Sequence, residues 1–145
     1  MSKARVMLVG AVGSGKTTLV RALHGNCDSV TKTQAMEYTA NSIDTPGEFI
    51  ENPFFYRALF ATSLEAEVII FIQDATREKS VFPPGFAGAF SKRTIGVVTK
   101  VDHPTANVER ASRFLKGLGL SGPVTNVSAI TGEGLDELKK VINWA

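Results

Sequence analysis

Cysteine and long apolar runs are scarce in this sequence, and each scarcity narrows what the chain can be. Its one cysteine, Cys27, excludes an internal disulfide and fits a reducing cytoplasm. The longest apolar run, residues 68–72, is far shorter than the roughly 20 residues that a membrane-spanning helix needs. The first residues lead almost directly into a predicted strand, so we expect no signal peptide and no membrane partner.

Positive and negative side chains are nearly equal in number. Sixteen lysines and arginines face 14 acidic residues, for a net charge of +2, and no basic stripe carries interleaved aromatics. We therefore expect no nucleic-acid partner. A hydrophobic content of 43% is ordinary for a soluble globular protein, and no repeat or linker interrupts the chain. These features predict one cytoplasmic domain over residues 1–145.

Short apolar segments alternate with amphipathic ones, which is typical of an α/β fold. Strands are predicted over residues 5–9, 33–39, 42–44, 68–73, 94–98 and 123–127. Helices are predicted over residues 18–24, 52–65, 104–118 and 134–144, with a short one ending at Phe90. A reversal at Asn41 should pair the second and third strands antiparallel. The pattern predicts a three-layer, doubly wound, mostly parallel six-stranded sheet, with ligands at the carboxyl ends of the strands.

Residues 10–18, Gly-Ala-Val-Gly-Ser-Gly-Lys-Thr-Thr, match the phosphate-binding loop pattern G-x-x-x-x-G-K-[ST]. Glycine lets such a backbone turn tightly, so that its N–H groups and the following helix form an anion site. We expect Lys16 to reach the β- and γ-phosphates and the Thr17 hydroxyl to ligate Mg²⁺. The residues expected to bind phosphate are Gly10, Gly13, Ser14, Gly15, Lys16, Thr17 and Thr18.

A second motif, Asp-Thr-Pro-Gly over residues 44–47, follows a predicted strand. In combination with the phosphate loop, Asp44 is expected to hold Mg²⁺, directly or through water. The Gly47 N–H can then sense a γ-phosphate.

Two further motifs indicate which nucleotide base would be bound. In Thr-Lys-Val-Asp, residues 99–102, the Asp102 carboxylate can accept hydrogen bonds from guanine N1–H and N2–H₂, a donor pair that adenine lacks. The Lys100 stem should cover the purine face, and Thr99, in place of the usual asparagine, should weaken a bridge to the phosphate loop. Ser128, Ala129 and Ile130 follow the last predicted strand, where a backbone N–H can contact the guanine oxygen.

These four motifs, in this order, resemble those of the Ras-like small GTPases over essentially the whole chain. Residues 32–35, 43–48, 51–52 and 82–86 resemble more closely the EutP/PduV family of ethanolamine- and propanediol-utilisation proteins. The resemblance implies a Ras-like G domain with a short switch region, and bacterial metabolism linked to microcompartments. It also implies that Thr33 is the switch threonine that coordinates Mg²⁺, with Thr31 as the competing candidate.

Departures from the Ras-like pattern bear on catalysis, for which Lys16, Thr33, Gly47 and Glu48 are the candidates. Glu48 stands where Ras-like enzymes carry a water-orienting glutamine, and a γ-phosphate repels a carboxylate. Val12 places a branched side chain in the loop. No arginine lies in the loop or beside Thr33, although Arg57 and Arg77 are alternatives. We therefore expect slow hydrolysis, with a partner in trans able to supply the missing groups.

Three functions remain open at this point. The first is a switch that binds GTP or GDP with Mg²⁺ and hydrolyses GTP slowly. The second is an ATP-dependent phosphotransferase to a small acid such as acetate, with an acceptor pocket bounded by Glu48 and residues 82–86, although Asp102 argues against ATP. The third is a module with vestigial nucleotide chemistry that docks on microcompartment shell or pathway proteins through residues 54–56, although such aromatics more often lie in the core.

Overall fold

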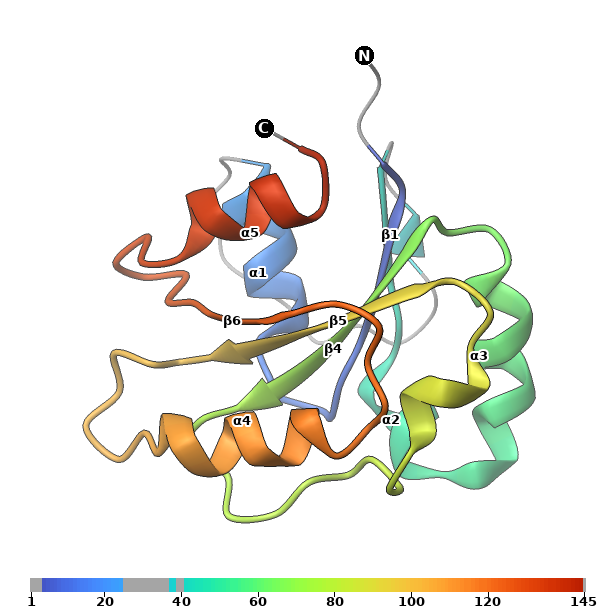
Figure 1. The fold of residues 1–145 in the computed structure, drawn as a ribbon, viewed down its shortest axis with the longest axis horizontal. Coiled ribbons are helices and arrows are strands. Elements are labelled where there is room, and N and C mark those ends of the chain that lie inside the picture. The colour runs from blue at the N-terminus through green and yellow to red at the C-terminus, as the bar shows by residue number, and fades with distance from the viewer. Residues whose placement is uncertain (1–3, 25–36, 39–40, 145) are drawn as a thin grey trace.

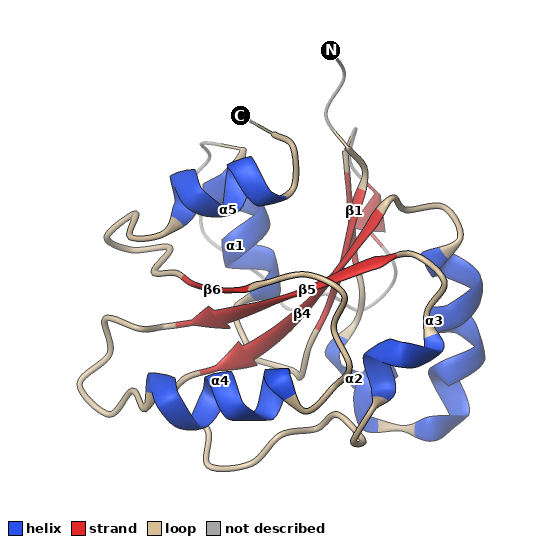
Figure 2. Ribbon diagram, in the orientation of Figure 1, coloured by secondary structure: helices blue, strands red, loops and turns tan. Residues whose placement is uncertain are grey.

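The computed structural model describes residues 4–24, 37–38 and 41–144. Within them, six strands form one sheet in the order β2-β3-β1-β4-β5-β6 (Figure 1; Figure 2). The parallel strands are β1 (Val6–Val9), β3 (Ser42–Asp44), β4 (Val68–Asp74), β5 (Arg93–Thr99) and β6 (Val124–Asn126). The edge strand β2 (Glu37–Tyr38) pairs antiparallel with β3. The predicted mostly parallel α/β sheet is therefore confirmed.

Helices cover both faces of the sheet, as predicted. On one face lie α1 (Lys16–Leu23) and α5 (Leu135–Val141) (Figure 1). The other face carries α2 (Gly47–Glu51), α3 (Tyr56–Ser63) and α4 (Val108–Lys116), with the short 3₁₀ helices η1 (Pro53–Phe55) and η2 (Phe86–Ala89). None of the helices in the described part of the chain is long and apolar enough to cross a bilayer.

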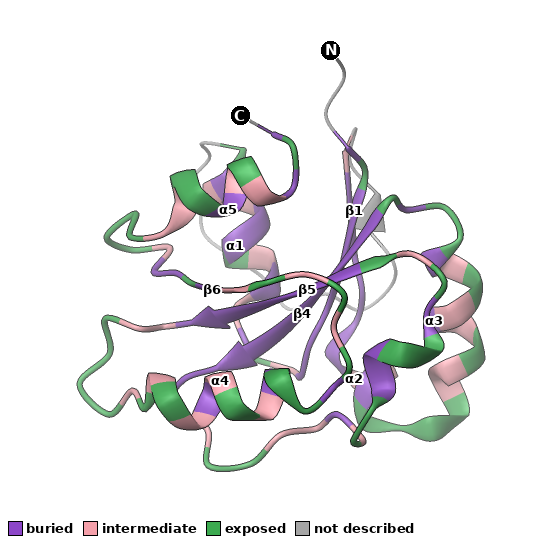
Figure 3. Ribbon diagram, in the orientation of Figure 1, coloured by how far each residue is buried: buried purple, intermediate pink, exposed green. Residues whose placement is uncertain are grey.

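The central strands are mainly apolar because both faces of the sheet are covered, and their polar residues lie mostly at the strand ends. In β1, Val6 and Leu8 pack in the cluster under α1 and α5, whereas Met7 and Val9 pack in the cluster under α2, α3 and α4. Every residue of β4 is buried, and Figure 3 shows these central strands as the buried part of the molecule. The core thus leaves only the strand ends free for chemistry.

The helix predicted over residues 52–65 is wrong in its bounds. Asn52 adopts an extended conformation with φ −131° and ψ 114°, and its side chain accepts a hydrogen bond from the Phe54 N–H at 3.0 Å. Pro53 explains the interruption, because a proline disfavours helical geometry in the residue before it. The predicted segment therefore contains η1 and then α3, which ends at Ser63. Helix α2, which was not predicted, precedes it over Gly47–Glu51.

Smaller differences have similar local causes. Helix α4 begins at Val108 instead of residue 104, because the Asn107 side chain caps it by accepting from the Arg110 N–H at 3.0 Å. Helix α1 begins at Lys16, inside the phosphate-loop motif, and α5 ends at Val141. Part of the predicted second strand lies outside the described residues, namely residues 33–36 and 39. The same holds for part of the predicted reversal around Asn41.

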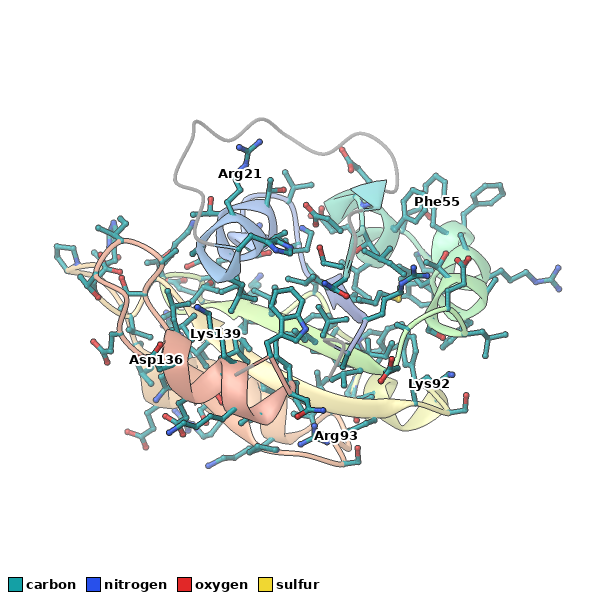
Figure 4. The ribbon with its side chains drawn as sticks, turned by 90° about the horizontal axis from the view of Figure 1, so that it is seen from above. Arg21, Phe55, Lys92, Arg93, Asp136 and Lys139 are labelled. Carbon is teal, nitrogen blue, oxygen red and sulfur yellow. The ribbon has the colours of Figure 1, made fainter. Side chains whose placement is uncertain are left out.

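The two ends of the described chain meet at the amino ends of the strands. The Trp144 indole Nε1 donates to the Ala4 carbonyl at 2.7 Å. Beside α5, the Arg93 Nη1 donates to the Val141 carbonyl at 2.6 Å (Figure 4). These contacts hold the last helix against the sheet.

Truncating Leu115 on α4 tests the packing of this layer. Leu115 is fully buried, and a β-carbon at Gly96 would lie 3.1 Å from its Cδ1, so α4 sits directly on β5. We expect Leu115→Ala to lower the free energy of unfolding by about 2–5 kcal/mol in urea titrations. The matched variant Leu64→Ala removes a side chain that is 63% exposed and should change it by less than about 1 kcal/mol. Equal losses in both variants would contradict this packing.

Candidate functional site

The loop between β1 and α1 has the backbone that its glycines predict. Gly13 and Gly15 have φ values of 76° and 97°, in the left-handed region that only glycine enters without cost. A β-carbon at Gly10 would lie 2.7 Å from the Ser14 Oγ and 3.0 Å from the Ile72 carbonyl. The loop therefore wraps tightly around the start of α1.

Lys16 is the first residue of α1 and is only 6% exposed. Its Nζ donates to the Ala11 carbonyl across the loop at 2.9 Å. A carbonyl dipole neutralises an ammonium only in part. An anion that reaches this loop would therefore meet a preformed positive site.

The charges around Lys16 act in opposite directions. Burial lowers the pKa of the Lys16 ammonium below its ordinary value. The carboxylates of Asp44, Glu51 and Glu48 raise that pKa again, and the Arg77 guanidinium lowers it by repulsion. Three acids and one further base thus face the loop, and the sequence analysis did not include Glu51 among them.

Asp44, at the end of β3, lies against the first turn of α1. The Thr17 Oγ1 donates to the Asp44 Oδ2 at 2.6 Å, and Asp44 is 4% exposed. Next to it, the Thr45 Oγ1 donates to the Leu8 carbonyl at 2.7 Å and ties β3 to β1. Two of the three side chains predicted to hold Mg²⁺, Thr17 and Asp44, therefore present adjacent oxygen atoms, the ligand type that Mg²⁺ prefers. The described residues contain no group of three or more His, Cys, Asp or Glu side chains placed to hold a metal.

Gly47 begins α2 in direct contact with the phosphate loop. A β-carbon there would lie 2.6 Å from the Val12 Cγ2 and closer still to the Val12 backbone, so only glycine fits. From the other end of α2, the Glu51 Oε2 accepts a hydrogen bond from the Val12 N–H at 3.3 Å. The sequence held a signal for this contact, because residues four apart on a helix share a face.

The end of β5 is tied to the phosphate loop at two points. The Thr99 Oγ1 donates to the Ser14 carbonyl at 2.7 Å, so threonine maintains the bridge that was expected to be weakened. The Lys100 Nζ donates to the Gly13 carbonyl at 2.8 Å and to the Asp74 Oδ2 at 2.8 Å. Lys100 adopts a φ of 59°, which is uncommon for a residue with a side chain. The loop is thereby fixed relative to the sheet.

Asp74 is a site residue that the sequence analysis missed. It is the last residue of β4, directly opposite Thr99 in the β4–β5 register. Burial by itself would raise the pKa of this carboxyl, but hydrogen bonds from Lys100 and from the Thr76 hydroxyl and N–H outweigh it, and the pKa is lowered. Asp74 therefore remains ionised and anchors Lys100.

A cavity of about 320 Å³ lies beside the loop and joins three of the four motifs. Its lining consists of Gly15, Thr18, Leu19, Thr99, Lys100, Asp102, His103, Val127, Ala129 and Ile130. The Ser128 Oγ accepts from the Thr131 N–H at 3.1 Å and shapes the turn that presents Ile130, which is 85% exposed. The cavity thus combines an apolar wall with the Asp102 carboxylate.

The remaining residues predicted for the site differ in where they lie. Thr33 and its competitor Thr31 lie outside the described residues. Glu48 is half-buried in the first turn of α2. Arg57 is exposed, as expected of a surface residue, but Arg77 is half-buried, and its Nη1 has no hydrogen-bond partner within the described part of the chain.

The aromatic residues that follow α2 are only partly in the core. Phe54 is 82% exposed, so the expectation that it lies in the core is wrong. The Phe55 ring stacks on Phe49 with centroids 4.6 Å apart, and Figure 4 shows Phe55 at the edge of the molecule. Tyr56 is half-buried and packs against Phe86. The interruption at Pro53 turns Phe54 outward.

Comparisons with known proteins agree with this arrangement. A family model described as "Ethanolamine utilisation - propanediol utilisation" matches residues 3–144. The chain is 38% identical over 141 residues to the "Propanediol utilization protein PduV" of Citrobacter freundii, covering 96% of this chain and 93% of that protein. It is 36% identical over 136 residues to the "Probable acetate kinase EutP" of Escherichia coli K12, covering 92% of this chain and 86% of that protein.

Solved structures show the same fold. The bacterial selenocysteine-specific elongation factor EF-Sec superposes with a TM-score of 0.69 at 22% identity. Era, in complex with MgGDPNP and a segment of 16S ribosomal RNA, superposes with a TM-score of 0.68 at 27% identity. Each match covers 99% of this chain, but only 28% of the EF-Sec chain and 57% of the Era chain. The fold is therefore that of a GTPase domain.

Replacing Asp74 tests the anchor of Lys100. The pKa of Asp74 in the folded protein lies below the value of about 3.9 of an unfolded aspartate. The stabilisation that ionised Asp74 gives to the folded protein is therefore complete above about pH 3.9 and is lost as the pH falls through the folded pKa. In urea unfolding, Asp74→Asn should therefore lower the free energy of unfolding by about 1–3 kcal/mol at pH 7, and the difference should narrow below about pH 4.

The matched control is Asp136→Asn, which removes an exposed carboxylate on α5 (Figure 4). It should cost about 0.3–1 kcal/mol through the helix dipole. A loss for Asp74→Asn that does not change with pH would contradict the ionised anchor.

Proposed function

Since the chain belongs to the EutP/PduV family of ethanolamine- and propanediol-utilisation proteins, we propose that it serves one of these bacterial pathways by binding GTP or GDP with Mg²⁺ and hydrolysing GTP slowly. One observation carries the proposal: a cavity adjoins the phosphate loop and is lined by Asp102, Ala129 and Ile130, so a base bound there would lie next to phosphates held by the loop.

The loop would hold the phosphates. The first residues of α1, from Lys16 on, would offer backbone N–H groups to them, and Lys16 supplies the ammonium. Gly10, Gly13 and Gly15 give the backbone its shape. The hydrogen bond from Lys16 to the Ala11 carbonyl is the one that an arriving phosphate would replace.

Mg²⁺ fits the oxygen atoms that Thr17 and Asp44 present. When bound, the ion supplies positive charge to the β- and γ-phosphates. Asp44 and the Thr17 hydroxyl would hold it, with Thr33 as the proposed switch threonine in the triphosphate state.

The base would occupy the cavity. The Asp102 carboxylate, exposed at the rim, would accept hydrogen bonds from guanine N1–H and N2–H₂. Lys100, fixed by Gly13 and Asp74, would cover one purine face. Ile130 adds apolar contact, and a backbone N–H of the turn containing Ser128 and Ala129 would meet the guanine oxygen.

Hydrolysis would be slow because the groups facing the γ-phosphate position are acidic. Glu48 and Glu51 both act on Lys16, and a carboxylate orients an attacking water poorly beside a phosphate. Gly47 could donate its N–H to the γ-phosphate, and Arg77 is the nearest arginine candidate. A partner in trans would complete the site.

A second candidate function has one observation in its favour. The relative in Escherichia coli is described as a probable acetate kinase, so phosphoryl transfer to a small carboxylate, with ATP as donor, is the alternative. The predicted acceptor pocket fits the structure poorly, because the Phe82 and Phe86 side chains are buried against Phe71. Asp102 also favours guanine over adenine.

A docking role would be compatible with either chemistry. Phe54 is the exposed large aromatic side chain beside α2, and a microcompartment shell or pathway protein could cover it. This would place the protein in the cytoplasm, in association with a microcompartment.

Equilibrium binding of GTP, GDP, ATP and XTP, with Mg²⁺ present, tests the site. Wild type should prefer GTP to ATP. Asp102→Asn should weaken GTP binding by about 2–4 kcal/mol and strengthen XTP binding, because it inverts the hydrogen-bonding pattern. A preference of the wild type for ATP would favour the phosphotransferase function over GTP binding.

The same titrations test the phosphate loop. Lys16→Ala should abolish triphosphate binding in a folded protein.

A single-turnover assay identifies the acceptor. With GTP alone, the purified wild type should release inorganic phosphate at about 10⁻⁴ s⁻¹ or more slowly. With acetate added, the product should remain inorganic phosphate. Acetyl phosphate formed in step with nucleotide loss would instead show that the acceptor is a carboxylate, and turnover at tens per second would reveal a missing catalytic group.

A further inference from the structure

Glu51 brings a carboxylate to the phosphate loop from outside the four motifs. It is the last residue of α2, four positions after Gly47, and helical side chains lean toward the amino end of their helix. Its Oε2 accepts from the Val12 N–H at 3.3 Å, across 39 residues of sequence. The carboxylate therefore lies over the start of its own helix, beside Gly47.

The position of this contact identifies which phosphate it affects. Val12 and Gly47 are in direct contact, and a β-carbon at Gly47 would clash with the Val12 backbone. Under the proposed function, the Gly47 N–H faces the γ-phosphate. An N–H group of an anion-binding loop is therefore already occupied by an internal anion at the γ-phosphate end, and not at the end nearer the base.

We propose that Glu51 is a specificity-determining residue that lowers the affinity for nucleoside triphosphate relative to diphosphate; the inference rests on the proposed nucleotide binding. A γ-phosphate must displace the carboxylate from the Val12 N–H and is repelled by it, whereas the α- and β-phosphates meet the loop elsewhere. Glu51 is exposed, so its displaced carboxylate is hydrated at little cost.

The electrostatics of the site agree with this role. The Glu51 carboxylate interacts with the Lys16 ammonium, the charge that the β- and γ-phosphates would share. Triphosphate binding therefore places a second anion beside one that already acts on Lys16. Since Glu51 itself is exposed, salt should screen its repulsion of the γ-phosphate.

The test measures two affinities in three proteins. GDP and a non-hydrolysable GTP analogue are titrated with Mg²⁺ into wild type, Glu51→Gln and Glu67→Gln at low and high salt. Glutamine keeps the shape of glutamate and a carbonyl acceptor for the Val12 N–H but removes the charge. Glu67 is an exposed carboxylate at the amino end of β4, away from the loop, and serves as the matched control.

Glu51→Gln should tighten binding of the GTP analogue about two- to fivefold at low salt, leave GDP affinity nearly unchanged, and lose this advantage at high salt. Glu67→Gln should leave the ratio of the two affinities as in wild type. An unchanged ratio in a folded Glu51→Gln protein that binds both nucleotides would overturn this inference alone. Failure of the wild type to bind either nucleotide would overturn the proposed function, and this inference with it.

Discussion

The burial of the Lys16 ammonium beneath a glycine-rich loop is the constraint on which the rest of this structure depends. A charge that is 6% exposed is costly unless neighbouring groups compensate it. Here the Ala11 carbonyl and three carboxylates on β3 and α2 do so in part, and the pKa of Lys16 remains lowered by burial. Those acids are brought within range by the parallel pairing of β1 with β3, which sets Leu8 opposite Asp44. The sheet order therefore determines which acids lie near Lys16 as well as how the core packs.

The loop is held from its other side by β4 and β5. Thr99 and Lys100 donate to the Ser14 and Gly13 carbonyls, and Asp74 holds Lys100 in place. These bonds fix two carbonyls on the side of the loop that faces β5. The contact between Gly47 and Val12 adds α2 to the same assembly. Residues from β4, from α2 and from the end of β5 thus fix one loop.

The local parts of this arrangement could be predicted from sequence, and the non-local parts could not. A strand, a glycine-rich loop and a helix follow one another directly, so the phosphate loop and the alternation of strands and helices were predictable. The bounds of the helix predicted over residues 52–65 were wrong, because the apolar pattern of that segment does not reveal the effect of Pro53 on the residue before it. Asp74 gained its role from its register opposite Thr99, and Glu51 from a contact across 39 residues. The register of Asp74 is not visible until the strands are in order, and the spacing of Glu51 from Gly47 is informative only once a helix is known to begin at Gly47.

The ion pair between Lys100 and Asp74 has a consequence for the kind of ligand that the cavity accepts. Asp74 already neutralises the Lys100 ammonium, which is held beside Gly13. Lys100 therefore does not cancel the charge of the Asp102 carboxylate on the cavity lining. The carboxylate attracts a hydrogen-bond donor and repels an acceptor, although the chain as a whole has a net charge of +2. The ion pair thus preserves a preference for ligands that present donors to this wall of the cavity.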